Sequence, residues 1–302
     1  MRPWLRRHIV ILFVIGTYAW TWGVGVPAAL AAHGIAYLRI SLGALTLAGF
    51  APTVVAIVLI AAAGGRAAIR DVWLRLASVS IAPTWYAAMV IAPIIVVGAT
   101  LLVLPASGAP VPELKAWYTP LLGILFLIPL TGLFEEIGWR GLMLDELEQR
   151  MTPLRASMLV AAAWGAWHIP TYLRLMPEGD RTPLLIALFL LAVFPLSMLF
   201  TWVYNRTGRR LLPVIVLHAG IDSSVAYFFA RLPTGELRPF IAWSAALWII
   251  AALVLWKEGP ALGQIEVRPR ALDPAGNTPA TKIPHVTRAI ARFQATHSED
   301  AR

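Results

Sequence analysis

The stretch FEEIGWRG, residues 134–141, places two glutamates and an arginine in one of the most apolar parts of the chain. Residues 114–133, which precede it directly, carry a single charge, Lys115. An apolar run of this kind is long enough to cross about 30 Å of hydrocarbon as a helix. We therefore predict a membrane helix over residues 118–139 that carries the two glutamates near its end.

The rest of the chain has the same apolar character. Of its 302 residues, 59% are hydrophobic and 14% are charged, and 13 are tryptophans. A soluble domain cannot bury so much apolar surface, so the composition indicates a polytopic membrane protein. The chain has no cysteine, which excludes disulfides, thiolate nucleophiles and cysteine-based metal sites. The net charge of +9 is typical of arginines that set membrane topology, and we expect no nucleic-acid partner.

Eight segments are apolar and long enough to be membrane helices. They cover residues 9–32, 41–65, 82–105, 118–139, 156–172, 183–204, 211–230 and 239–256. We therefore predict an all-α fold, a polytopic membrane helix bundle of about eight transmembrane helices that occupies residues 1–257. Residues 258–302 are rich in Pro, Ala, Thr and Arg and are predicted to be a mostly disordered cytoplasmic tail.

The distribution of basic residues predicts an orientation. With the N-terminus inside, 19 of the 25 lysines and arginines fall in cytoplasmic segments and 6 fall outside. This bias predicts a multi-pass protein with both termini cytoplasmic. The short loops and the lack of a eukaryotic sorting signal indicate a prokaryotic plasma membrane.

Two further segments have a distinct membrane character. The first apolar run resembles a signal peptide, with Arg2, Arg6 and Arg7 ahead of it. It is longer than a usual signal core, so we expect a retained signal anchor. Residues 66–78 mix leucine and valine with arginine and aspartate, which predicts an interfacial amphipathic helix.

Six ionisable side chains remain within or at the margin of the predicted membrane helices: Glu135, Glu136, Arg140, His168, His218 and Asp222. A charged group at a helix centre costs roughly 2.5–3.5 kcal/mol on insertion scales, so such groups normally face a cavity and act there. Glu136 and Arg140 are four residues apart and can pair on one helix face. The spacing of His218 and Asp222 is the same. Glu135 lies about 100° away from Glu136 and is free to face the bundle.

Each of these residues also has a purely structural interpretation. Two glutamates at a helix end are often solvated, a membrane histidine is often a packing residue, and a histidine–aspartate pair can be a simple hydrogen bond. Trp164 and Trp167 are predicted to be packing or interface residues. The rise per residue nevertheless allows Glu135, His168 and His218 to reach one pocket. Because three separate helices each bring such a group, we favour a shared functional site.

Three motifs match a known family pattern in order and in spacing. EEIGWR (135–140) resembles the EExxxR motif of the CAAX protease and bacteriocin-processing family, the CPBP or Abi intramembrane proteases. WGAWH (164–168) resembles its FxxxH motif, with Trp164 where phenylalanine is usual. HAGID (218–222) is similar to its third motif, a histidine followed four residues later by Asn or Asp. The resemblance covers about residues 115–230. It implies a type II CAAX endopeptidase, a class whose eukaryotic members remove a C-terminal tripeptide after a prenylated cysteine.

The resemblance also implies roles for individual residues. Glu135 would be the base that activates water, aided by His168. His218 and Asp222 would bind or polarise the scissile carbonyl and its oxyanion. The chemistry is consistent, because peptide hydrolysis without a Ser or Cys nucleophile needs an activated water, a base and an oxyanion stabiliser. A glutamate in an apolar cavity is also a stronger base, since burial disfavours its charged form.

The other two motif residues, Glu136 and Arg140, would form the ion pair that holds the site in shape. Two histidines with acidic oxygens could instead hold zinc through Glu135, His168 and His218, with the metal activating the water. The helix motif HExxH is absent from the sequence. We favour the metal-free glutamate mechanism and expect no cofactor, with zinc as the alternative.

The expected partners are the lipid bilayer and a membrane-associated protein or peptide substrate. Prenylated CAAX proteins are not expected in a prokaryote, so the substrate itself is not defined by the sequence. Two other classes of protein remain open. A non-catalytic membrane immunity or scaffold protein needs no further sequence feature. A proton-coupled transporter would also carry carboxylates and histidines within its helices, although the inverted repeats of transporters are not evident.

Overall fold

The computed structural model describes residues 3–35, 39–105, 108, 118–175, 182–229 and 237–264. Within these ranges every regular element is a helix, and the predicted all-α fold of a polytopic membrane bundle is confirmed. The α-helices are α1 (Pro3–Ala32), α2 (Leu42–Gly49), α3 (Ala51–Ala77), α4 (Pro83–Val103), α5 (Thr119–Leu127), α6 (Leu133–Gly138), α7 (Asp145–Leu147), α8 (Pro153–Trp167), α9 (Ile169–Leu175), α10 (Thr182–Arg206), α11 (Leu211–Phe229) and α12 (Arg238–Glu258). Two π-helical segments, η2 (Ile128–Gly132) and η3 (Trp139–Leu144), and one 3₁₀ turn, η4 (Gly259–Ala261), complete the described elements.

Six helical stretches in the described ranges are long and apolar enough to cross a membrane. They are Trp4–Ala32, Ala51–Ala77, Pro83–Leu102, Leu122–Leu147, Pro183–Arg206 and Arg238–Ala261. The other two segments expected from sequence are also helical, but shorter. Residues 156–172 are divided at His168 into α8 and α9, and the apolar helix Leu211–Tyr227 falls short of the length of the six.

The chain around residues 41–78 departs from the simple pattern of one span and one surface helix. The expected span begins as α2 and restarts as α3 after Phe50, where Pro52 occupies the first turn. Proline fits there because the first amides of a helix have no intrahelical partner. The segment predicted to be an amphipathic helix, residues 66–78, is helical up to Ala77 and forms the second half of α3. Gly65 marks the junction, with φ of 62° and ψ of −153°, a conformation that favours glycine.

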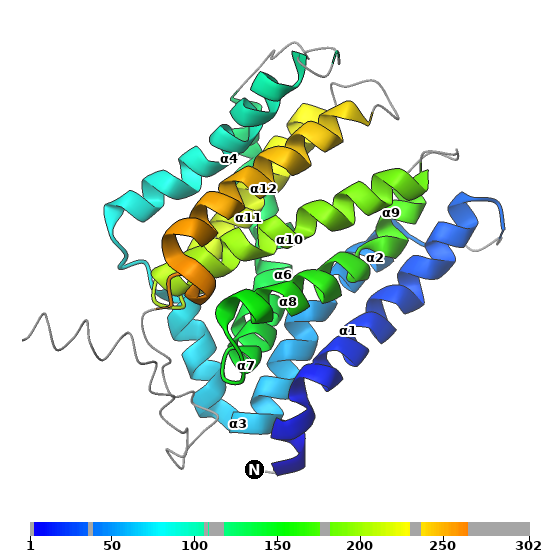
Figure 1. The fold of residues 1–302 in the computed structure, drawn as a ribbon. Helices are drawn as coiled ribbons and strands as arrows, with labels where there is room; N and C mark the ends of the chain where they lie inside the picture. The colour runs from blue at the N-terminus through cyan, green and yellow to red at the C-terminus, as the bar shows by residue number, and fades with distance from the viewer. Residues whose placement is uncertain are drawn as a thin grey trace, which may run out of the picture. The chain divides into compact units, whose positions relative to one another are not determined.

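Helix α6 lies in the middle of the bundle (Figure 1). Every residue from Phe134 to Glu148 is buried. Six of these fifteen residues are ionisable, so their side chains need partners inside the bundle. Two glycines allow the neighbouring backbones to approach. A Cβ on Gly132 would lie 2.6 Å from the carbonyl oxygen of Ile215 in α11, and one on Gly138 would lie 2.6 Å from that of Pro52 in α3. The position of the two glutamates is therefore fixed by backbone-to-backbone packing.

Helix α1 is bonded to the helices that carry the WGAWH motif. The Tyr18 hydroxyl donates to the carbonyl oxygen of Ala163, and the Trp22 indole donates to that of Trp167 at 3.3 Å. The Trp167 indole in turn donates to the Thr21 hydroxyl at 2.9 Å. These bonds make α1 part of the wall behind the motif.

At the other end of the described bundle, the chain continues past residue 257 in a folded conformation. A 3₁₀ turn follows α12, and Leu262 after it is fully buried. A side chain at Gly263 would collide with Arg206, and the φ of Gly263 is 73°. The rest of the predicted tail, from residue 265 onward, lies outside the described residues.

Candidate active site

The buried ionisable groups meet at the carboxylate of Glu136. Its Oε1 atom accepts a hydrogen bond from Arg140 Nη1 at 2.9 Å and lies 2.8 Å from His218 Nδ1. The side chains of Glu136 and Arg140 are 0% exposed and that of His218 is 3% exposed. A carboxylate oxygen accepts, so Nδ1 of His218 is the donor. One carboxylate therefore joins the EEIGWR helix to the HAGID helix.

The Arg140 guanidinium is held between aromatic rings as well as by Glu136. Its Cζ atom lies 4.9 Å from the ring centroid of Trp164 and 4.9 Å from that of Phe200. Cation–π contacts contribute about 2 kcal/mol when they are desolvated. The expected Glu136–Arg140 pair is thus present and is enclosed by α8 and α10.

Glu135 faces a different direction from its neighbour, as its position on the helix predicts. It is 6% exposed, and its Oε2 atom accepts a hydrogen bond from Trp164 Nε1 at 2.6 Å. The two adjacent glutamates therefore have different partners. Glu136 belongs to an ion pair, whereas Glu135 accepts a hydrogen bond from a neutral indole N–H.

His168 lies where α8 ends, in an aromatic enclosure. Its Nδ1 atom is 2.9 Å from the carbonyl oxygen of Trp164. Because a carbonyl oxygen only accepts, Nδ1 carries the proton and Nε2 is the nitrogen left to accept one. The ring contacts four aromatic side chains at centroid distances of 4.6 to 6.2 Å, those of Trp164, Trp167, Tyr172 and Phe189. A histidine so enclosed can serve as a base within an apolar setting.

His218 and Asp222 face each other along α11, as their spacing predicts. The distance from Nε2 to Oδ2 is 3.4 Å. The side chain of Asp222 is 37% exposed, whereas those of His218 and Glu136 are 3% and 0% exposed. The site is therefore buried around Glu136 and open at Asp222.

Two features of this site were not predicted from the sequence. Trp164 was predicted to be a packing residue, yet it touches Glu135, Arg140 and both motif histidines. The signal available in the sequence was the tryptophan at a position where the motif usually has phenylalanine. The bond between Glu136 and His218 was also unforeseen, because it joins residues that are 82 positions apart.

The alternative zinc site depends on the donor atoms of Glu135, His168 and His218. Among the described residues, no three or more His, Cys, Asp or Glu side chains are grouped so that they could hold a metal ion. The Nδ1 atom of His218 is bonded to Glu136, and that of His168 to the Trp164 carbonyl. The observed side-chain positions in the described part of the chain do not bring Glu135, His168 and His218 together as a zinc ligand set.

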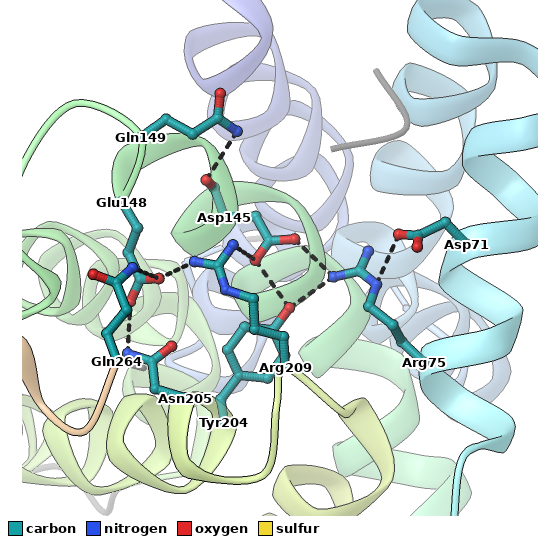
Figure 2. A network of polar contacts seen from close by, with 9 residues as sticks. All are labelled: Asp71, Arg75, Asp145, Glu148, Gln149, Tyr204, Asn205, Arg209 and Gln264. Atoms are coloured by element: carbon teal, nitrogen blue, oxygen red, sulfur yellow. Dashed lines mark hydrogen bonds and ion pairs between the residues drawn. The ribbon is translucent and has the colours of Figure 1, made fainter. Parts of the chain in front are cut away.

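A second polar network surrounds the C-terminal end of the helix that carries the two glutamates (Figure 2). Asp145 accepts from Arg75 Nη1 at 2.7 Å and from the Tyr204 hydroxyl at 2.9 Å, and its Oδ1 lies 3.4 Å from Arg209 Nη1. Arg75 also bonds Asp71, within α3. Asp145 thereby connects the helix of the glutamates to α3, to α10 and to the turn after α10.

The network continues from Arg209 to Glu148 and beyond (Figure 2). Glu148 pairs with Arg209 and accepts hydrogen bonds from Asn205 at 3.0 Å and from Gln264 at 3.2 Å. Burial opposes the charged form of Arg209, but the neighbouring carboxylates of Asp145 and Glu148 outweigh it and hold the pKa of Arg209 above its ordinary range. Arg209 also has a φ of 62°, so its backbone conformation and its side-chain bonds fix the turn together.

The fold and the site define a class: a polytopic membrane helix bundle with buried glutamate, histidine and arginine side chains brought together from three helices. Residues 117–224 match the family described as "Type II CAAX prenyl endopeptidase Rce1-like". The chain is also similar to a protein named CAAX prenyl protease 2 from Methanococcus maripaludis, with 25% identity over 224 residues that cover 70% of this chain and 80% of the relative. Both comparisons support a CAAX protease family for this chain, and they indicate CAAX prenyl protease-like activity.

Proposed function

We propose that this protein is an intramembrane endopeptidase that hydrolyses a peptide bond of a membrane-associated protein or peptide by means of a water activated by Glu135 and His168. The observation that carries the proposal is the placement of Glu135. It is a carboxylate that is 6% exposed, has no arginine bonded to it among the described residues, and is adjacent to the Glu136–His218 pair.

The proposed reaction begins with removal of a proton from water. Glu135 accepts the proton while the water oxygen attacks the scissile carbonyl carbon, and the Nε2 atom of His168 supports this step. A tetrahedral intermediate forms, with negative charge on the former carbonyl oxygen. His218 in its imidazolium form, through Nε2, and Asp222 in protonated form donate to that oxygen. Collapse of the intermediate breaks the C–N bond, and the proton held by Glu135 passes to the leaving amine.

The ion pair at Glu136 has a supporting role in this proposal. Arg140 keeps Glu136 in place, and Glu136 orients the imidazole of His218 through Nδ1. The side of the ring that carries Nε2 is then directed toward Asp222, where the site is open. A fixed ring orientation matters because misplacement by about 1 Å can cost about 10²-fold in rate.

A direct test replaces Glu135 by glutamine. The amide keeps the shape of the side chain and removes the base, so cleavage of a membrane-presented peptide by protein reconstituted in lipid should fall by roughly 10²–10⁴. Glu299→Gln, the same replacement in the C-terminal segment, should leave cleavage unchanged. Full turnover by Glu135→Gln would remove the glutamate from the mechanism. It would favour the immunity, scaffold or transporter alternatives, which do not need a base at this position.

The same proposal includes a topology in a prokaryotic plasma membrane with both termini cytoplasmic. It is supported by the bias of the basic residues, 19 of 25 on the cytoplasmic side. Reporter fusions after residues 108, 178 and 236 should report the outside, and a fusion after residue 208 should report the cytoplasm. Cytoplasmic signal at 178 together with external signal at 208 would overturn this orientation.

A further inference from the structure

We infer that Trp164 is a positioning residue for Glu135, and that its indole N–H, which a phenylalanine lacks, holds one carboxylate oxygen and leaves the other to accept the proton. The inference rests on the proposed function, because it assigns a role within the same reaction. It concerns the one position at which the three motifs of this chain depart from the family pattern.

The contact itself is short and direct. Trp164 is 4% exposed, and its Nε1 atom lies 2.6 Å from Oε2 of Glu135. An indole nitrogen is only a donor, so the carboxylate oxygen is the acceptor. Hydrogen bonds to an ionised acceptor are shorter and about twice as strong as neutral ones. The distance is that of a direct hydrogen bond, which would be strongest when the carboxylate is charged.

The direction of the N–H is set by contacts around the whole indole. The ring is edge-on to His218, with centroids 5.2 Å apart and planes at 82°, and similarly to His168 at 5.7 Å and 67°. The Arg140 guanidinium lies 4.9 Å from the ring centroid. The ring therefore cannot turn without disturbing three other site residues, and the N–H remains directed at Glu135.

Other tryptophans show that this pairing is not a general result of burial. The indole nitrogens of Trp139 and Trp202 are buried and have no hydrogen-bond partner among the described residues. Trp164 is different because a carboxylate faces its N–H. Trp167, three residues further along the same helix, donates to a neutral hydroxyl, that of Thr21.

Two consequences follow for the reaction. Because Oε2 of Glu135 is bonded to the indole, Oε1 is the oxygen that remains to take a proton from water. A hydrogen bond to the charged form also favours that form against the effect of burial. Removal of the N–H should leave Glu135 protonated, and thus unable to act as a base, over a wider range of acidic pH.

The experiment compares Trp164→Phe with Trp167→Phe. Both variants keep an aromatic ring in the same helix, and each removes one indole N–H. Peptide cleavage is measured between about pH 5 and pH 9, with kcat and KM determined separately. We expect Trp164→Phe to lower kcat about 10- to 100-fold, the range of a hydrogen bond to a charged group, with little change in KM. The acid limb of its pH–rate profile should move to higher pH. Trp167→Phe should leave the acid limb unchanged.

A second variant separates the N–H from the shape of the ring. Replacing Trp164 alone by β-(3-benzothienyl)alanine keeps the bicyclic ring and substitutes sulfur for the N–H, so it should reproduce the shifted acid limb even if Trp164→Phe fails to fold. A profile identical to that of the unchanged protein would overturn the inference. Glu135→Gln is assayed alongside. An inactive Glu135→Gln with an unshifted Trp164 variant refutes only the role of Trp164, whereas an active Glu135→Gln refutes the proposed function as well.

Discussion

The Nδ1 atom of His218 lies 2.8 Å from Oε1 of Glu136, although the two residues are 82 positions apart in the chain. The sequence pattern paired each of them with a residue on its own helix, and those contacts are also present. The additional bond between helices makes Glu136 more than the partner of an arginine. It fixes the imidazole whose other side faces Asp222, so a residue of the EEIGWR motif sets the orientation of the histidine of the HAGID motif.

The enclosed Glu136–Arg140 pair should contribute strongly to stability. Arg140→Ala leaves a fully buried carboxylate without its cation, which costs roughly 3–5 kcal/mol. The variant should express poorly or show a lower melting temperature in detergent, together with a loss of activity. Arg150→Ala is the control, because Arg150 is exposed and exposed charges contribute about 1 kcal/mol or less. Unchanged melting of Arg140→Ala would contradict the structural role.

The dependence of cleavage on a metal ion is tested by chelation. If Glu135 and His168 activate the water without a metal, the purified protein should contain far less than one equivalent of zinc. Exhaustive chelation should then leave peptide cleavage intact. Stoichiometric zinc by elemental analysis, lost together with activity and restored with it, would show that His168 and His218 are ligands and would replace the proposed mechanism.

The network at Asp145 should stabilise the bundle as a coupled unit. Asp145→Asn removes the negative charge between Arg75 and Arg209, and we expect a loss of about 3 kcal/mol, as for a buried pair that loses one partner. Combining it with Arg75→Gln should cost less than the sum of the two single changes, because groups in contact are not additive. Gln149→Ala is the control, since Gln149 bonds only the backbone oxygen of Asp145. Simple additivity would mean that the network is not coupled.

The two glycines beside the glutamates should tolerate no side chain. At Gly138 a Cβ would lie 2.6 Å from the Pro52 oxygen and 2.9 Å from Phe13, and overpacking of this kind typically costs 1–3 kcal/mol. Gly138→Ala should therefore lower the melting temperature and the activity together. At Gly98, a helical glycine with open space around it, alanine should be neutral or stabilising by up to about 1 kcal/mol. Equal melting temperatures for the two variants would contradict this packing.

Much of the site could be predicted from local spacing. The four-residue intervals placed Glu136 with Arg140 and His218 with Asp222, and the 100° step between neighbours separated Glu135 from Glu136. These relationships depend only on helix geometry. The apolar segments likewise predicted the helices, because hydrocarbon thickness sets their length.

The relationships between helices could not be predicted in the same way. The bonds from Trp164 to Glu135 and from His218 to Glu136 depend on how each helix is rotated about its axis, which spacing within one helix does not define. Arg209 was counted as a basic residue of a cytoplasmic loop, yet it is buried against Asp145 and Glu148. Its partners lie about 60 residues earlier in the chain, so nothing near Arg209 in the sequence indicates its burial.

The backbone contacts at Gly132 and Gly138 also constrain movement. Because the carbonyl oxygens of Ile215 and Pro52 touch this helix at the two glycines, the helix cannot slide or rotate without a collision of main chains. A protein that admits a substrate from the bilayer has to open somewhere, and the opening must then occur in helices that meet this one through side chains alone. The two glutamates therefore lie on the helix that is least able to move. Hydrogen exchange should accordingly find the amides of α6 among the slowest in the chain, whether or not a substrate is bound.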